Sequence, residues 1–243
     1  MDISQNNNKT INILLFGENG NGKSTLGNAL LGFDAFDTSY RSKQPVGKKG
    51  IGERANLFVI ESHGFQDPTG MDKYYIIDFL TYIKEKKELN AILLVFNYQQ
   101  TRFPYNIQIM LKIFCDFFSL NEIGNHIGFI FTNAFTRKGP LTTKEKNLKL
   151  EKKLPEFIRI IEEISKSKIS NNIFSGFVDI DSIEGIDENG KKNLERIIEW
   201  ASSLSNLNIQ TNKDFVSVFK IATQDLEEKL KIQEDNQKEI KEK

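Results

Sequence analysis

The stretch Gly17-Glu18-Asn19-Gly20-Asn21-Gly22-Lys23-Ser24, GENGNGKS, decides the fold of this 243-residue chain. It follows the apolar run INILLF and precedes KSTLGNALLG, in which leucines recur at helical spacing. The spacing G-x-x-x-x-G-K-[ST] between a buried strand and a helix is that of a phosphate-binding loop. Glycines let backbone N–H groups turn toward phosphate oxygens, and the helix N-terminus adds partial positive charge. The stretch therefore predicts a nucleotide site.

Two side chains of this loop have distinct expected roles. Lys23 is expected to reach the β- and γ-phosphates, and the Ser24 hydroxyl to bind Mg²⁺. The predicted nucleotide contacts are the whole loop and the first helical residue after it: Gly17, Glu18, Asn19, Gly20, Asn21, Gly22, Lys23, Ser24 and Thr25.

A second motif follows the next buried strand, Leu57 to Ile60. In nucleotide-hydrolysing folds of this type, the end of that strand supplies an acidic group near Mg²⁺ and a glycine near the γ-phosphate. VIESHG offers Glu61 and Gly64 at the D-x-x-G spacing, with glutamate in place of aspartate. Glu61 is therefore a predicted metal ligand and Gly64 a predicted nucleotide contact; the alternative is that Glu61 is a polar strand end.

Apolar strands alternate with helical patterns along most of the chain. The expected strands are 10–16, 57–60, 91–97, 127–132 and 174–180, with an edge strand between 33 and 56. The expected helices are 71–87, 107–120, 144–168 and 191–204, besides the one after the loop, and Pro155 predicts a break or kink. This alternation predicts an α/β fold with three layers, a mostly parallel sheet flanked by helices.

The expected organisation is a flexible N-terminus over 1–9, one nucleotide-binding domain over 10–205, and a C-terminal helical extension over 206–243. The extension has a partial apolar stripe before a lysine- and glutamate-rich end. Two interpretations remain: a solvated helix resting on the domain, or a helix that binds a protein partner or a membrane.

Composition limits the class of protein. Lys and Arg together number 33, as do Asp and Glu, so charge gives no support for a nucleic-acid partner. The single cysteine, Cys115, lies in the apolar context LKIFCDFF and is expected in the core, and two histidines cannot make a His-rich metal site. The N-terminus lacks an apolar signal region, and no run approaches the ~20 apolar residues that span a bilayer. These features predict a cytoplasmic protein.

The run GENGNGKSTLGNALLG resembles the start of the immunity-associated nucleotide-binding family, the AIG/GIMAP-type GTPases. That family has a G-N-x-x-L-G segment after its phosphate loop, matched here by Gly27, Asn28, Leu31 and Gly32. AILLVFNYQQTRF is similar to the family's hydrophobic box, an apolar strand followed by an Arg-Phe or Arg-Tyr pair. Order and spacing agree from about residue 11 to residue 200. The resemblance implies a P-loop G domain over 10–205 that binds GTP or GDP with Mg²⁺.

Several positions depart from the family pattern. Its first-switch threonine has no clear counterpart: Ser42 is the nearest by spacing and is taken as a metal-ligand candidate, and Thr38 is the other. The base-reading segment TNAFTRKGP has no acidic residue between Thr132 and Pro140. Asn133 is the predicted base contact, Phe135 or Arg137 could stack on the base, and Asp179 or Asp181 could contribute from the next strand end.

Hydrolysis is expected to be slow, because Phe65 stands where many small GTPases place a water-orienting glutamine. Two residues are candidates for compensating roles: His63, next to Gly64, and Arg102, whose position in the box resembles that of an arginine the family offers across a dimer. The sequence therefore predicts a guanine-nucleotide switch that forms a nucleotide-dependent homodimer or oligomer, with slow GTP hydrolysis that homodimerisation promotes. The alternative is a nucleotide-binding scaffold with little hydrolysis or with relaxed base specificity.

Overall fold

The structure is a computed structural model of the chain. It describes residues 10–38, 46–52, 55–62, 72–118, 123–136, 139–169, 173–181, 185–209, 213–214, 217–218 and 220. The N-terminal segment 1–9 and most of the predicted helical extension lie outside these residues, as do three predicted site residues: Ser42, His63 and Gly64.

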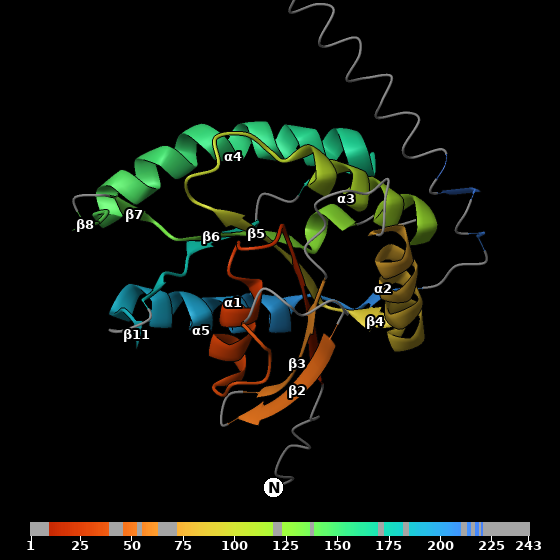
Figure 1. Ribbon diagram of the computed structural model, residues 1–243, viewed down its shortest axis with the longest axis horizontal. Helices are drawn as coiled ribbons and strands as arrows, with labels where there is room; N and C mark the ends of the chain where they lie inside the picture. Colours follow the sequence, from red (N-terminus) through yellow and green to blue (C-terminus); the bar gives the residue numbers. More distant parts are fainter. Residues whose placement is uncertain are drawn as a thin grey trace, which may run out of the picture.

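A six-stranded sheet forms the centre of the molecule (Figure 1). In spatial order its strands are β2 (Val46–Gly52), β3 (Ala55–Glu61), β1 (Ile11–Phe16), β5 (Ala91–Asn97), β6 (Ile127–Thr132) and β9 (Phe174–Phe177). Five strands are parallel, and β2 pairs antiparallel with β3 as the predicted edge strand. The apolar character of β1, β5 and β6 follows from burial on both faces of the sheet.

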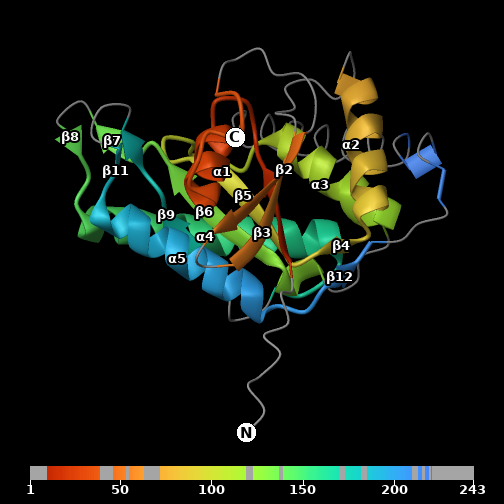
Figure 2. The same cartoon turned by 90° about the horizontal axis from the view of Figure 1, so that it is seen from below.

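Helices cover both faces of this sheet (Figures 1 and 2). One face packs against α1 (Lys23–Leu31) and α5 (Glu188–Ser203). The other packs against α2 (Asp72–Lys86), α3 (Tyr105–Phe118) and α4 (Thr143–Ser165). The predicted three-layer α/β architecture is confirmed.

Phenylalanines dominate the core on the α2–α3–α4 side. Phe96 at the end of β5 has its ring centroid 5.2 Å from that of Phe103 and 4.9 Å from that of Phe157 in α4. Cys115 in α3 is buried, and burial raises the pKa of its thiol, which confirms the prediction that it belongs to the core.

Helix α4 begins with a capping box. The Thr142 hydroxyl accepts the Glu145 N–H, and the Glu145 carboxylate accepts the Thr142 N–H. The helix then runs through Pro155 without interruption, so the break considered from the sequence does not occur. The apolar side chains of its second half, such as Phe157 and Ile161, bury against the sheet and hold the helix together across the proline.

The chain after α5 crosses to the α2–α3 side of the sheet. Leu207–Asn208 form strand β12, which pairs with β4 (Glu88–Leu89), so the part of the predicted extension described here begins as a strand. Leu207 and Ile209 are buried in the core, and the Ile209 N–H donates to the Lys87 carbonyl at 2.8 Å. The division at residue 205 stays a prediction.

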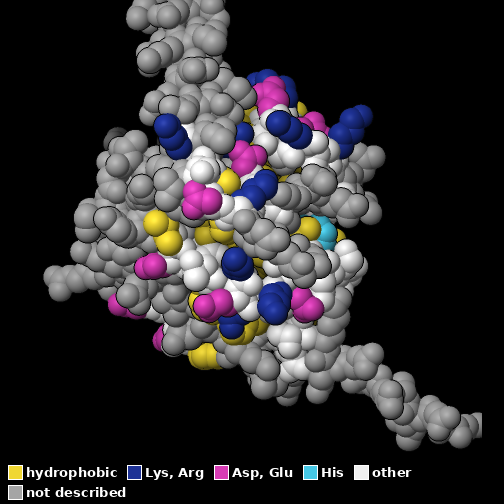
Figure 3. Space-filling model, turned by 90° about the vertical axis from the view of Figure 1, so that its right-hand side faces the viewer, with side chains coloured by type: hydrophobic (Ala, Val, Ile, Leu, Met, Phe, Trp, Pro, Cys, Tyr) yellow, Lys and Arg dark blue, Asp and Glu magenta, His cyan; other side chains and the backbone are white. Residues whose placement is uncertain are grey.

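Shorter elements complete the chain: η1 (Ile123–Asn125), β7 (Phe135–Thr136) paired with β8 (Gly139–Pro140), and β10 (Ile180–Asp181) paired with β11 (Gly185–Ile186). Basic and acidic side chains are interspersed over the described part of the face shown in Figure 3. Within the described ranges, every helix falls short of the length and apolar character needed to cross a bilayer.

Candidate nucleotide-binding site

The predicted phosphate loop connects the carboxyl end of β1 to the first turn of α1 (Figure 1). Gly20 and Gly22 have φ values of 79° and 81°, in the left-handed region that favours glycine. At Gly17 an added Cβ would lie 2.4 Å from the Val95 carbonyl oxygen of β5. The three glycines are therefore required by backbone conformation or by close packing.

Lys23 is folded back over this loop and is 4% exposed. Its Nζ donates to the Glu18 carbonyl at 3.1 Å. Burial lowers the pKa of Lys23 to about 8, and the charges of Glu61 and Glu18 partly oppose that effect. A buried ammonium that donates to a carbonyl is suited to bind an anion, because burial has removed the water that would otherwise solvate its charge.

Ser24 and Glu61 meet beside Lys23. The Ser24 hydroxyl donates to Glu61 Oε1 at 2.7 Å. Burial raises the pKa of Glu61, while Lys23 and the Ser24 hydrogen bond lower it. A hydroxyl and a carboxylate side by side are oxygen donors of the kind that Mg²⁺ binds, so these residues fit that ion. Next to them Ser62 is 1% exposed, and its hydroxyl has no hydrogen-bond partner among the described residues.

The loop is fastened to strands β5 and β6. Asn21 Nδ2 donates to the Val95 carbonyl at 2.9 Å, and the Thr132 hydroxyl donates to the Asn21 carbonyl at 2.8 Å. Thr132 was not among the predicted site residues. The signal in the sequence is a buried polar residue that ends an otherwise apolar strand, IGFIFT.

The turn after β5 carries the predicted dimer arginine. Arg102 is exposed, while the adjacent Phe103 is buried and anchors the turn on Phe96 and Phe157. Gln100 of this turn donates through Nε2 to the Glu18 carboxylate of the phosphate loop. Gln100 was also missed by the sequence analysis, because the contact joins residues 82 positions apart.

The base-reading segment follows Thr132, which places Asn133 beside the phosphate loop. Asn133 is exposed and has φ 55°. The Ala134 N–H donates to Asp179 Oδ1 at 2.7 Å, and Asp179 Oδ2 pairs with Lys146 at 2.5 Å. Asp179 is 6% exposed, so its carboxylate supports the base-reading segment from the interior of the protein. The Phe135 side chain, Arg137 and the Asp181 side chain lie outside the described residues.

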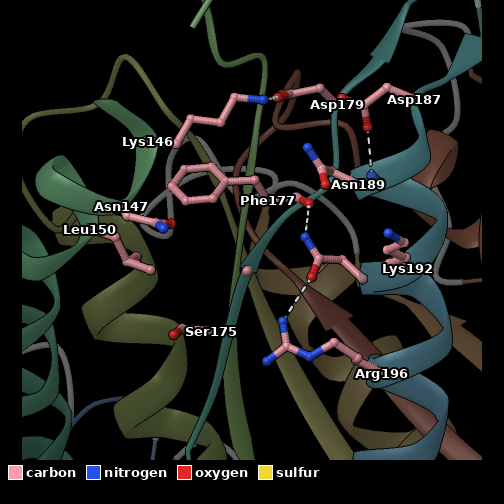
Figure 4. A pocket seen from close by; sticks show the side chains of 13 residues that line it. Lys146, Asn147, Leu150, Ser175, Phe177, Asp179, Asp187, Asn189, Lys192 and Arg196 are labelled. Carbon is pink, nitrogen blue, oxygen red and sulfur yellow. Dashed lines mark hydrogen bonds and ion pairs between the residues drawn. The ribbon is translucent and has the colours of Figure 1, made fainter. Parts of the chain in front are cut away.

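The Lys146–Asp179 pair also forms one wall of a pocket of about 290 Å³ between α4, β9 and α5 (Figure 4). Asp187 caps α5 beside it by accepting the Gly190 N–H, and Asn193 donates to the Phe177 carbonyl at 2.8 Å. The pocket thus lies at the β9 edge of the sheet.

The structure brings most of the predicted nucleotide contacts together. Residues 17–25 form one continuous loop and helix start, Glu61 contacts Ser24, and Asn133 follows the threonine that holds the loop. Arg102 lies apart from them on the surface of the turn after β5. Thr38, the other first-switch candidate, is exposed.

Comparison with known proteins places this site in context. The family model described as "AIG1 family" matches residues 11–173, about two thirds of the chain. No curated protein matches the chain in sequence.

Several solved structures share the fold. Toc33 from Arabidopsis thaliana in complex with GDP and Mg²⁺ is 14% identical, with a TM-score of 0.65 over 83% of this chain and 88% of that one. A second structure is 13% identical, with a TM-score of 0.63 over 83% of this chain and 86% of that one. Its description reads "Dimerization is important for the GTPase activity of chloroplast translocon components atToc33 and psToc159". Era in complex with MgGDPNP and part of 16S ribosomal RNA is 16% identical, with a TM-score of 0.53 over 85% and 60%. These likenesses confirm the P-loop fold.

Proposed function

The chain belongs to the AIG1 family, and on this premise we propose that it is a guanine-nucleotide-binding switch protein. It binds GTP and GDP with Mg²⁺, hydrolyses GTP slowly and turns over faster as a homodimer. The observation that carries the proposal is the buried Lys23 ammonium resting on a loop carbonyl, beside the Ser24–Glu61 pair. The likeness to Toc33, a structure with GDP and Mg²⁺, supports the choice of ligand.

Each part of the site has a role in nucleotide binding. Residues 17–25 surround the β- and γ-phosphates, Lys23 exchanges the Glu18 carbonyl for phosphate oxygens, and Gly64 approaches the γ-phosphate. Ser24, Glu61 and Ser42 are the proposed metal ligands. When bound, Mg²⁺ neutralises charge on the phosphate oxygens. Asn133 contacts the base.

Turnover depends on residues outside the loop. Phe65 has no group that orients water, so hydrolysis by one copy alone is slow. Arg102 is exposed at the end of a turn anchored by Phe103, a position from which it can reach the phosphates of a second copy. His63 is the other proposed catalytic residue. The described dependence of atToc33 and psToc159 activity on dimerization supports this scheme.

One observation favours the alternative of relaxed base specificity. The Asp179 carboxylate, which contacts the base segment, already binds the Ala134 N–H and Lys146. The segment 132–140 itself contains no aspartate or glutamate that could recognise guanine.

Equilibrium binding of GDP, GTP and ATP with Mg²⁺, by calorimetry, tests the proposal. A guanine preference of a hundredfold or more supports the switch; equal affinities support relaxed specificity; no binding overturns both. Lys23→Ala should remove binding of all three nucleotides.

Single-turnover hydrolysis measured against protein concentration tests the dimer. The rate should rise steeply with concentration, and Arg102→Ala should abolish the rise without changing GDP affinity. A rate independent of concentration would leave the scaffold as the better description.

A further inference from the structure

Gln100 lies outside the phosphate loop. Its side chain contacts both ends of residues 18–21, the four loop residues between Gly17 and Gly22. Its Nε2 donates to the Glu18 carboxylate, and its Oε1 accepts from Asn21 Nδ2 at 3.4 Å. The same Oε1 accepts the Asn97 N–H at 3.1 Å, which fixes the side chain to the end of β5. Gln100 therefore links β5 to two positions that shape the loop.

The contact with Glu18 bears on Lys23. The Glu18 carbonyl is the acceptor on which the Lys23 ammonium rests, and the Glu18 side chain is the one that Gln100 holds. Movement of Glu18 would shift the carbonyl that positions the phosphate-binding lysine. Side chains that hold a binding group in place need partners of their own, because an unsupported loop loses its geometry.

Gln100 has such a partner in α4. Lys153 is 9% exposed, and its Nζ donates to the Tyr98 carbonyl at 2.9 Å and to the Gln100 carbonyl. The Lys153 ammonium also lies 5.5 Å from the centre of the Tyr98 ring. A buried lysine bound to two carbonyls of one turn fixes that turn at the cost of desolvating a charge.

We propose that Gln100, held in place by Lys153, is a positioning residue for the phosphate loop and sets the rate at which bound nucleotide is released. The proposal rests on the nucleotide binding proposed above.

Nucleotide release tests the proposal with a charge exchange between positions 18 and 100. Gln100→Glu places a carboxylate against Glu18 and is expected to speed release of a fluorescent GDP analogue by about tenfold. Glu18→Gln keeps an acceptor for Gln100 and is the reference for the double variant, because Glu18 itself belongs to the phosphate loop and its charge acts on Lys23. The double variant Glu18→Gln/Gln100→Glu restores a donor and an acceptor, so its release returns to within threefold of the Glu18→Gln rate.

Two matched controls accompany these variants. Gln99→Glu adds the same charge at the neighbouring, exposed position and should leave release unchanged. Lys153→Met should speed release, whereas Lys149→Met, which removes an ammonium 3.9 Å from the Tyr98 ring centre, should have the smaller effect.

The outcomes separate this inference from the proposed function. A parent protein that binds no guanine nucleotide overturns the function and with it the inference. A parent that binds, with a Gln100→Glu variant that releases at the parental rate, overturns the inference alone. A double variant as fast as Gln100→Glu would do the same, because the effect would then not arise from the Glu18 contact. Unfolding transitions of each variant show whether the fold is retained.

Discussion

Single residues in the phosphate loop are fixed by what surrounds them as much as by what they bind. Gly17 packs against the backbone of β5, and Lys23 remains buried although burial opposes its charge. Nucleotide phosphates reverse that opposition, because they bring negative charge to the buried ammonium. The loop therefore maintains an unfavourable arrangement that ligand binding relieves, as expected of a binding site that is preformed.

Gly17→Ala should weaken GDP binding by at least tenfold. Its Cβ would lie 2.4 Å from a backbone oxygen of Val95, so the loop or the strand must shift. We also expect a loss of about 1–3 kcal/mol in the free energy of unfolding.

Gly32→Ala is the matched control. No atom lies within 4 Å of a Cβ at that position, where φ is 79°. It should cost about 1 kcal/mol of stability and leave GDP affinity unchanged. Titration with GDP and denaturant unfolding of both variants measure these effects; parental affinity in Gly17→Ala would contradict the prediction.

Lys153 should make stability depend on pH. Burial, with a smaller effect of Lys149, lowers the pKa of Lys153 to about 8 from 10.5. Between these values the unfolded chain holds a proton that the folded chain lacks, so this residue's contribution to the free energy of unfolding rises with pH. Below pH 8 the penalty for burying the charge is complete. The stability of the parent relative to Lys153→Met should therefore increase from pH 7 to pH 9.5.

Denaturant unfolding at the two pH values measures that difference. Lys152→Met, at an exposed position on the same helix, provides the control, because its ammonium stays in water. A parent-to-Lys153→Met difference that is constant with pH would show that the Lys153 ammonium is solvated.

At the scale of elements, the site is assembled by four strand ends. Strand β1 leads into the loop, β3 places Glu61 against Ser24, β5 accepts from Asn21 through the Val95 carbonyl, and β6 binds the loop through Thr132. Helix α4 then braces two connections at once, with Lys153 on the turn after β5 and Lys146 on Asp179 below the base segment. The phosphate and base segments thus share one supporting helix.

Thr132→Val tests the link between β6 and the loop. It leaves the Asn21 carbonyl without the Thr132 donor and should cost about 0.5–1.5 kcal/mol of stability and speed nucleotide release severalfold. Thr132→Ser keeps the hydroxyl and should retain most of the parental behaviour. A valine variant that releases nucleotide at the parental rate, beside a serine variant that releases it faster, would show that the methyl group rather than the hydrogen bond is what matters.

For the whole molecule, the segment after α5 closes the core at the end of the sheet opposite the loop. Asn90 joins three segments there: its backbone N–H donates to the Asn12 carbonyl, its Oδ1 accepts the Asn12 N–H, and its Nδ2 donates to Asn206. Leu207 and Ile209 then fill the core beside β4. Residues 206–209 are therefore part of the packed body.

Ile209→Ala should lower the free energy of unfolding by about 2–5 kcal/mol, because the side chain is 1% exposed. GDP affinity, measured under conditions in which the variant is fully folded, should not change, since the site lies at the other end of the sheet. Ser202→Ala, at an exposed position near the end of α5, should have little effect on either quantity. Stability unchanged in Ile209→Ala would mean that this segment does not hold the core.

The sequence determined what local pattern and composition can carry. Residues 91–97 and 127–132 are continuous apolar runs, and the structure has β5 and β6 at those bounds. GENGNGKS determined the loop, because its glycines stand where the backbone adopts positive φ values. The alternation of strands and helices along the chain determined the three layers.

Only the tertiary structure decided the contacts between distant positions. Gln100 meets Glu18 across 82 residues, Thr132 meets Asn21 across 111, and Asp179 is taken up by Ala134 and Lys146 rather than left for the base. Strand β12 is two residues long and carries no local pattern. Such partners are set by where the folded sheet brings strand ends together, because a buried polar side chain bonds to the groups that the fold places within its reach.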